Sequence, residues 1–402
     1  MKRKLFTIFC RLMGISFLAV ALVFSVTSAG HSGEVRGVTD DTIKIGLIAD
    51  MTGPTATDIS RPILTGLKTQ FRYINDKGGI HGRKINLLIE DDRYVIPHAV
   101  AAFKKLVFKD EILALQGPLS SSSAFALLGQ IHKRGIPTIS YSPSDRMILP
   151  IQKYVFTCNG QYEDDIHVVF QYLFKEIKES HIALVYPDME VGLAALRAAE
   201  EETKRRDVKL HKEILNIGAL DATTQVLNLQ RAKVRHVIIQ APAFTAVILL
   251  RSAVKLGFHA RYYGTTVTTT EDIIETGGTA AKDYIGASQY TSWYDNCPGA
   301  EKVRKAMMKY YNKIPMKSRG LCMGWVGGMV LTEGLTNAGR DLTPERLRDA
   351  LEGMKNLDTG GLTGPISYSP NDHKGLDCAR IFKPDLDKKV FVAITDWMRG
   401  AK

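Results

Sequence analysis

Short apolar runs alternate with amphipathic stretches from Asp41 onward, and this alternation limits the possible folds more than any other feature. Residues 43–49 form a nearly continuous apolar run, and residues 85–89 and 136–141 form two more. The stretches between such runs carry apolar residues at helical spacing and stop at glycines, as helices do. Strands that alternate with helices are typical of parallel sheets covered by helices. The sequence therefore predicts an α/β fold with parallel sheets.

A polar or Gly/Pro-containing loop follows each strand predicted in the first part of the chain. These loops cover residues 51–54, 90–92, 116–123 and 142–144. In open α/β sheets, ligands bind outside the carboxyl ends of the strands. We therefore expect any binding site to lie at this edge.

A second round of strands and helices begins near Tyr162. Segments 112–118 and 236–242 share one layout, in which an apolar strand ends in Gln-x-Pro and a helix follows. The length of 402 residues also exceeds one ordinary domain. We infer two Rossmann-like, doubly wound lobes, joined where late strands return across the boundary and form a hinge. The predicted limits are 41–160 plus 287–380 for lobe 1 and 161–286 plus 381–402 for lobe 2.

The N-terminus has the order of a secretory signal. Three basic residues, Lys2 to Lys4, precede an apolar run over 12–26 and the small residues 27–29. The run is shorter than the roughly 20 residues that a membrane-spanning helix needs. We predict a signal peptide over 1–29, cleavage near Ala29 and an exported, periplasmic protein. An uncleaved N-terminal anchor is the alternative.

Charge and cysteine content narrow the function classes. The net charge is +11, and the basic residues are scattered, so we predict no nucleic-acid binding and a mild preference for anionic ligands. Cys158, Cys297, Cys322 and Cys378 follow the signal, without the spacing of a metal site. They fit buried thiols as well as bridges, for which Cys297–Cys322 and Cys158–Cys378 are the candidate pairs.

Catalytic motifs are absent from the sequence. It contains no GxGxxG, GxxxxGK[ST], HExxH, GxSxG or CxxC pattern, and its histidines are scattered. Two wound lobes with loops at a cleft and no nucleophile–base pair favour a binding module over a hydrolase or transferase. We predict no enzyme activity, no cofactor and no metal.

The stretch 116–123, Gln-Gly-Pro-Leu-Ser-Ser-Ser-Ser, joins a strand to a helix. The first turn of a helix has N–H groups without intrahelical partners and partial positive charge, and serine hydroxyls add further donors. A carboxylate or phosphate fits such a site. The alternative is that Ser120 or Ser121 only caps the helix.

Several segments together resemble one known family. They are Ile43-Lys-Ile-Gly-Leu-Ile-Ala-Asp-Met-Thr-Gly-Pro54, Ile74-Asn-Asp-Lys-Gly-Gly-Ile-His-Gly82, Glu90-Asp-Asp92, the serine loop and Gly135-Ile-Pro-Thr-Ile-Ser140. They are similar to the leucine/isoleucine/valine-binding protein family, the periplasmic type I solute-binding proteins of ABC importers. The resemblance runs from about residue 39 to 394 and is strongest in the first third.

The resemblance implies two lobes joined by three crossovers, which close over a small ligand. It implies docking on an ABC permease served by an ATPase. We expect the protein to be a monomer. Serines hold the ligand carboxylate in this family, and an acidic residue holds its ammonium group. The positions that match the family's ligand contacts are Ser121 and Ser122, Ser142 and Ser144, Thr266, Tyr294 with the adjacent Trp293, and Phe244 as a replacement for tyrosines near Val191 and Ala243.

One departure leaves the ligand open. Thr266 stands where the family has its acidic residue, and a buried ammonium without a carboxylate is costly. Either a nearby acid replaces it, or the ligand has no amino group. The candidate acids are Glu271, Asp272, Asp188 and Glu190.

The expected function is therefore that of an extracytoplasmic substrate-binding protein of a branched-chain amino acid-type ABC transporter. Its ligand would be an amino acid or a related organic acid. The alternative is a two-lobed sensor that presents its closed state to a receptor or regulatory partner.

Overall fold

The computed structural model describes residues 35–176, 181–314 and 317–400. The predicted signal peptide lies outside these residues. Among them, no helix combines the length and apolar character that crossing a membrane requires.

The first sheet is fully parallel and has the strand order β2-β1-β3-β4-β5. Its longest pairing joins β1 to β2 in register from Thr42 opposite Lys84 to Ala49 opposite Asp91. The apolar run at 43–49 forms β1, which lies inside the sheet and is buried on both faces from Ile45 to Ala49. The run at 85–89 lies in β2, an edge strand that is mostly half-buried. The strands are β1 (Thr42–Ala49), β2 (Lys84–Asp91), β3 (Ala114–Gln116), β4 (Thr138–Ser140) and β5 (Val155–Thr157).

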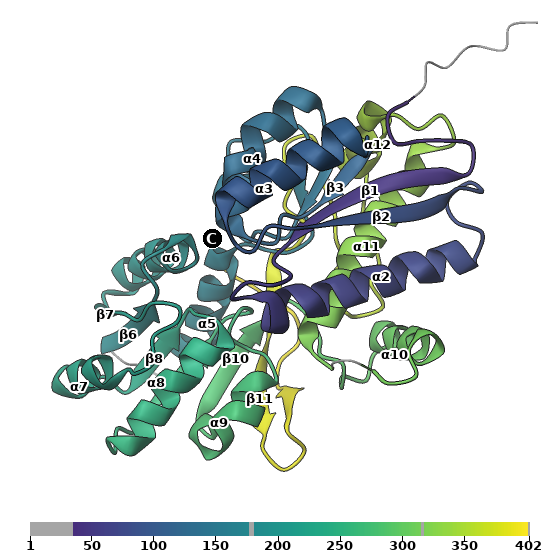
Figure 1. The fold of residues 1–402 in the computed structure, drawn as a ribbon. Helices are drawn as coiled ribbons and strands as arrows, with labels where there is room; N and C mark the ends of the chain where they lie inside the picture. Colours follow the sequence, from purple (N-terminus) through teal and green to yellow (C-terminus); the bar gives the residue numbers. More distant parts are fainter. Residues whose placement is uncertain (1–34, 177–180, 315–316, 401–402) are drawn as a thin grey trace, which may run out of the picture. The chain divides into compact units, whose positions relative to one another are not determined.

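Helices cover both faces of the first sheet (Figure 1). One face carries α3 (Ile96–Lys104) and α4 (Ser121–Arg134), and the other carries α2 (Arg61–Asp76) and α11 (Arg319–Ala338). The π-helical turn η1 (Ala56–Ser60) precedes α2, and η2 (Lys105–Lys109) continues α3, so the helical segment 96–109 changes from α- to π-helical hydrogen bonding midway. The remaining elements of this lobe are η3 (Asp145–Met147), α10 (Pro298–Tyr310) and α12 (Pro344–Glu352).

Two glycines bring α2 and α11 into close contact. A Cβ atom on Gly66 would lie 2.0 Å from the Leu321 carbonyl oxygen, and one on Gly324 would lie 1.9 Å from that of Ile63. Both distances are shorter than any real contact, so the approach of these helices requires glycine at both positions. The contact holds the first turns of α2 and α11 side by side, next to the cavity described below.

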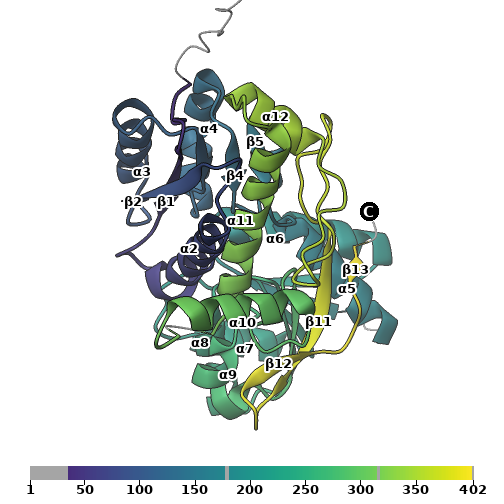
Figure 2. The ribbon, with the colours of Figure 1, turned by 90° about the vertical axis from the view of Figure 1, so that its right-hand side faces the viewer.

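The second sheet has the order β12-β11-β10-β9-β8-β6-β7. Five adjacent strands, β10-β9-β8-β6-β7, are parallel, whereas β11 and β12 are antiparallel, and β13 pairs with β11. These late strands, yellow in Figure 2, are those expected to return across the lobes. The strands are β6 (His181–Tyr186), β7 (Lys209–Ile214), β8 (His236–Ile239), β9 (Arg261–Gly264), β10 (Tyr284–Ser288), β11 (Cys378–Asp385), β12 (Val390–Ala393) and β13 (Met398–Arg399).

Two buried clusters fix helices to the faces of the second sheet. One face packs against α5 and α6, and the other packs against α7, α8 and α9. The strands of the sheet alternate between these clusters, since Val237 and Ile239 face one and Ile238 faces the other. The helices are α5 (Tyr162–Glu176), α6 (Glu190–Arg206), α7 (Thr223–Arg231), α8 (Ala243–Lys255), α9 (Asp272–Gly277) and the 3-10 turn η4 (Gly278–Ala281).

The chain passes between the two lobes three times, around residues 158–161, 289–297 and 365–377. The predicted limits 286/287 and 380/381 fall inside β10 and β11, which both belong to the second sheet. The lobe limits stay a prediction. Near the third passage, Leu357 and Ile366 form only an isolated bridge.

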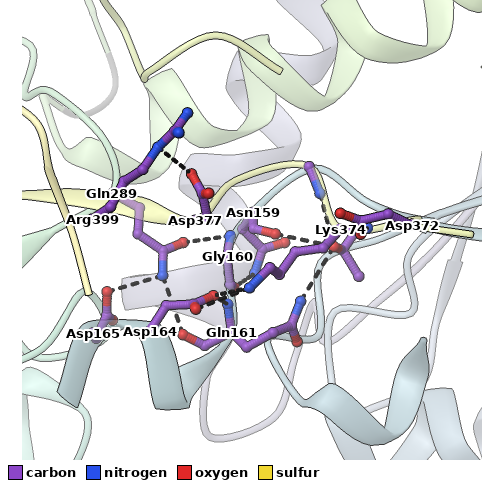
Figure 3. Close-up of polar contacts among 12 residues, drawn as sticks. Asn159, Gly160, Gln161, Asp164, Asp165, Gln289, Asp372, Lys374, Asp377 and Arg399 are labelled. Atoms are coloured by element: carbon purple, nitrogen blue, oxygen red, sulfur yellow. Dashed lines mark hydrogen bonds and ion pairs between the residues drawn. The ribbon is translucent and has the colours of Figure 1, made fainter. Parts of the chain in front are cut away.

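A buried polar network ties the three passages together (Figure 3). The Gly160 N–H donates to Gln289 Oε1 at 2.8 Å, and Gln289 Nε2 donates to Asp165 Oδ1 at 2.9 Å. Lys374 of the third passage reaches Asp164 Oδ1 at 2.9 Å. We call Gly160, Asp164, Asp165, Gln289 and Lys374 the hinge cluster.

Candidate functional site

The serine loop turns sharply between β3 and α4. Gly117 has a φ of +89°, and a Cβ atom there would lie 2.7 Å from the Ile48 carbonyl oxygen, so this turn requires glycine. Ser120 is the N-cap, and its Oγ accepts from the Ser123 N–H at 3.4 Å. The capping role therefore falls on Ser120, and the side chains of Ser121 and Ser122 occupy the first turn of α4.

A cavity of about 150 Å³ lies in front of this turn and is lined by residues of both lobes. Three of the predicted contacts line it: Ser121 and Ser122 from the first lobe, and Thr266 from the second. Much of the remaining wall is apolar. Ligand sites usually combine an apolar lining with a few polar groups that fix the orientation of the ligand. Apolar lining residues are Ile59, Ile63, Leu119 and Met323 from the first lobe and Val191 and Val267 from the second.

Ser142 and Ser144 lie beside the cavity, but protein groups engage their hydroxyls. Ser142 Oγ donates to Ser121 Oγ at 2.7 Å, and Ser144 Oγ donates to Glu190 Oε1 at 2.8 Å. Both serines are buried, and neither lines the cavity. Ser142 therefore orients Ser121.

The predicted aromatic contacts do not line the cavity. Trp293 is buried, Phe244 is half-buried, and Tyr294 is 41% exposed. Ser292 and Asp295 close a turn around Trp293 and Tyr294, and Arg304 of α10 binds the Trp293 carbonyl oxygen, which holds this segment on the α10 side. Sequence reasoning missed the aromatic residues that do line the cavity: Tyr94, Tyr141, Tyr162 and Tyr290.

An acid reaches Thr266 from an element that the sequence did not indicate. Asp165, in the first turn of α5, accepts from the Thr266 N–H at 2.9 Å and from Thr266 Oγ1 at 3.0 Å. Its third donor is Gln289 Nε2, and Asp165 itself lines the cavity. Burial raises the pKa of Asp165 to about 7. The sequence feature that points to Asp165 is the run of three acidic residues at 163–165. Acidic residues are favoured in the first turn of any helix, so this run does not by itself indicate a ligand site.

The acids that the sequence did suggest have different surroundings. Glu190 lines the cavity and binds Ser144, Arg146 and Arg197. Asp188 is exposed, and Asp272 accepts from Thr270 Oγ1. Glu271 is buried outside the lining, 3.9 Å from Arg319 Nε, and burial raises its pKa.

Arg319 is the one cationic residue among the described residues that line the cavity. It begins α11 in the first lobe, and its Nη1 donates to the Tyr290 carbonyl oxygen at 2.7 Å. Its guanidinium carbon lies 4.0 Å from the ring centroid of Phe382, a residue of β11 in the second sheet. The side chain therefore spans from one lobe to the other behind the cavity.

The four cysteines in the described part of the chain are free thiols, so the structure contains neither of the two candidate bridges. Cys158, Cys322 and Cys378 are buried, and burial raises the pKa of Cys378 to about 11 and that of Cys158 to about 12. Thiols with such pKa values are unreactive at neutral pH. The described part of the chain also holds no group of three or more His, Cys, Asp or Glu placed to bind a metal ion.

Sequence comparison identifies relatives that cover most of the chain. The model of the periplasmic binding protein family matches residues 42–389. The leucine-, isoleucine-, valine-, threonine- and alanine-binding protein of Pseudomonas aeruginosa is 24% identical over 317 residues, 77% of this chain and 82% of that protein. Leu/Ile/Val-binding protein homolog 7 of Brucella suis is 24% identical over 310 residues, 73% and 76% of the two chains.

Solved structures with this fold include two with a TM-score of 0.83. The branched chain amino acid ABC transporter protein of Thermus thermophilus, with bound valine, is 22% identical, and the match covers 90% of this chain and 98% of that one. The fatty acid ABC transporter substrate-binding protein of Thermomonospora curvata is 24% identical, with 91% and 95% covered. These likenesses confirm the predicted fold.

The family match also confirms the resemblance inferred from the sequence motifs. Proteins of this family bind solutes rather than catalyse reactions, and they work outside the cytoplasm. With 42–389 matched, the chain belongs to the periplasmic binding protein family.

Proposed function

We propose that this protein is the substrate-binding component of a branched-chain amino acid-type ABC importer and that it captures a small carboxylate-bearing ligand. The observation that carries the proposal is the cavity, which both lobes line and which the first turn of α4 faces with Ser121 and Ser122. Hydroxyls and free N–H groups at a helix N-terminus suit a carboxylate. The names of the relatives, which bind branched-chain amino acids or belong to fatty acid transport, support this ligand class.

Ligand capture proceeds by closure of the two lobes. A ligand that contacts both walls binds the closed state more tightly than the open one, and this difference in affinity shifts the population toward closure. The permease then receives the closed form. The hinge cluster stays intact because its hydrogen bonds join the three passages themselves.

The opposite end of the ligand meets Thr266 and Asp165. An ammonium group there pairs with the Asp165 carboxylate and lowers its pKa, so an amino acid binds with proton release near neutral pH. A ligand without an amino group leaves the pKa of Asp165 near 7 and releases no proton from it. The two ligand classes are therefore separable by their effect on this one carboxyl.

The proposal also includes the route of the protein to its place of work. Residues 1–29 serve as a signal peptide that is cleaved near Ala29, and the mature protein acts as a monomer in the periplasm. The apolar run at 12–26 and the extracytoplasmic family support this part. N-terminal sequencing of the protein isolated from the periplasm tests it.

The decisive test is calorimetry with matched ligand pairs: leucine against 4-methylpentanoate, and phenylalanine against 3-phenylpropanoate. We expect at least one pair member to bind, and Ser121→Ala to weaken that binding about tenfold, as loss of a hydrogen bond to a charged group does. The control is Thr343→Ala, which removes the N-cap hydroxyl of α12 outside the cavity. If no carboxylate binds, or if Ser121→Ala and Thr343→Ala are alike, the proposed site is wrong.

A further inference from the structure

A carboxylate of the second lobe reaches a loop of the first lobe beside the cavity. Glu190 begins α6, and its Oε1 accepts from Ser144 Oγ at 2.8 Å while its Oε2 accepts from Arg146 Nη1 at 3.2 Å. Ser144 and Arg146 belong to the loop that follows β4. We call Ser144, Arg146 and Glu190 the mouth contact.

The carboxylate is held from its own lobe as well. Arg197, one to two turns further along α6, donates to Glu190 Oε1 at 3.1 Å and to Glu163 Oε1 at 3.2 Å. Both Glu190 oxygens therefore have donors before any ligand is considered. Arg197 fixes the direction of the carboxylate so that it faces the other lobe.

The mouth contact forms part of the cavity wall. Glu190 lines the cavity together with its neighbours Met189 and Val191, and Pro143 lines it from the opposite loop. When the loop and the start of α6 separate, this side of the wall opens. The contact therefore exists only while the two lobes are close.

The strength of the contact follows from its exposure. The Glu190 side chain is 13% exposed, and Ser144 is fully buried, so their hydrogen bond to a charged acceptor lies away from bulk water. The Arg146 side chain is 64% exposed, so solvent screens its ion pair. Ser144 contributes most of the closing free energy, and Arg146 contributes less.

We propose that Glu190 and Ser144 form a latch that sets the fraction of closed protein and thereby scales the affinity for every ligand by the same factor. The apparent dissociation constant rises as the closed fraction falls. Glu190 and Ser144 are positioning residues under this proposal, and the carboxylate does not select among ligands. The affinity part rests on the proposed function, whereas the closure part does not.

The test measures closure in the empty protein and affinity in parallel. Spin labels on Lys133→Cys in α4 and Lys204→Cys in α6, both exposed positions, report the distance between the lobes in a Cys297→Ser background. Glu190→Gln, Ser144→Ala and the double variant are compared with Glu200→Gln. Glu200 lies on the same helix but pairs with Lys212 within the second lobe, so it is a matched control.

We expect Glu190→Gln and Ser144→Ala to lengthen the label distance and to weaken all bound ligands by the same factor, about three- to tenfold. The double variant should match the stronger single variant, and the thermal midpoint and the control should not change. Loss of affinity confined to ligands with an ammonium group, at an unchanged distance, would show that Glu190 contacts ligand and would overturn the latch. Unchanged distances in both variants would also overturn it. If wild-type protein binds no carboxylate, the proposed function fails, and the distance measurement still decides the latch.

Discussion

The mouth contact and the hinge cluster both join the two lobes, but they differ in their exposure to water. At the mouth, charged side chains meet across the cavity wall, and the Arg146 side chain is 64% exposed. At the hinge, Gln289 and Asp165 are each 2% exposed, and neutral donors supply the bonds to Asp165. The mouth contact reaches water on its arginine side, whereas Gln289 and Asp165 are buried and line the cavity.

This difference matches what each set of contacts has to do. An exposed ion pair loses little when it separates, because water replaces the partner. A buried donor or acceptor that loses its partner costs roughly 1–3 kcal/mol, because no water replaces it. When the lobes separate, water reaches Ser144 and Glu190 as well as Arg146, so the mouth contact is suited to break and reform at each binding cycle. The hinge cluster is suited to persist while the lobes rotate about it.

The largest expected effect is at Lys374. Lys374→Met leaves Asp164, which is 8% exposed, without its cation, and an unpaired buried charge costs about 3–5 kcal/mol of unfolding free energy. Urea denaturation measures this loss. The double variant Lys374→Met with Asp164→Asn should recover a large part of it, and failure to recover any would mean that Lys374 acts through its packing alone.

Gln289→Leu should have the next largest effect. It removes the acceptor of the Gly160 N–H and one donor to Asp165, so we expect a loss of about 2 kcal/mol in urea denaturation. Gln225→Leu, which removes a side-chain donor to a backbone carbonyl on the exposed edge of the second lobe, is the control. Equal losses of unfolding free energy in the two variants would show that the buried hinge contacts are worth no more than an exposed hydrogen bond.

The pH dependence of stability tests Asp165. Its pKa is raised from an ordinary 3.8 to about 7, so the folded protein resists ionisation that the unfolded chain undergoes. The stability that this group provides is present below about pH 4 and is lost as the pH rises to about 7. Asp165→Asn abolishes this titration. Its unfolding free energy, measured relative to wild type, should therefore rise between pH 4 and 7 and stay level above that; a flat difference would contradict the raised pKa.

Arg146→Gln should have the smallest effect. The pair with Glu190 is exposed on the arginine side, so we expect a change of at most about 0.5 kcal/mol in unfolding free energy. Thermal denaturation at low and high salt checks this, because high salt should erase the remaining difference. A loss of unfolding free energy as large as that of Gln289→Leu would mean that the mouth contact stabilises the protein as much as the hinge contacts do.

The fold was predictable because its signals are local. The apolar run at 43–49 becomes β1 with one extra residue, and the run at 85–89 lies within β2. The serine loop was predictable for the same reason, since Gly117 and the serines that follow it determine the turn and the helix start by themselves. The lengths and order of the elements follow from periodicity along the chain.

The part of the cavity wall around Asp165 and Thr266 could not be predicted, because it depends on hydrogen bonds between residues that are distant in the sequence. Asp165 and Thr266 are 101 residues apart, and Gly160 and Gln289 are 129 residues apart. No periodicity links such positions. The direction of a side chain is equally hidden: Trp293 and Tyr294 looked like cavity residues, but the turn that holds them places both outside the lining.

The stack of Arg319 on Phe382 has a mechanical consequence. A hydrogen bond has a preferred angle and weakens as its groups rotate, but a cation over an aromatic face keeps much of its attraction as it slides across the ring. The guanidinium of Arg319 in α11 and the ring of Phe382 in β11 therefore stay in attractive contact while the two lobes move past each other. Phe382→Leu would keep an apolar side chain at this position and remove the cation–π attraction to Arg319. The lobes would then still rotate, but their relative path would be less restricted.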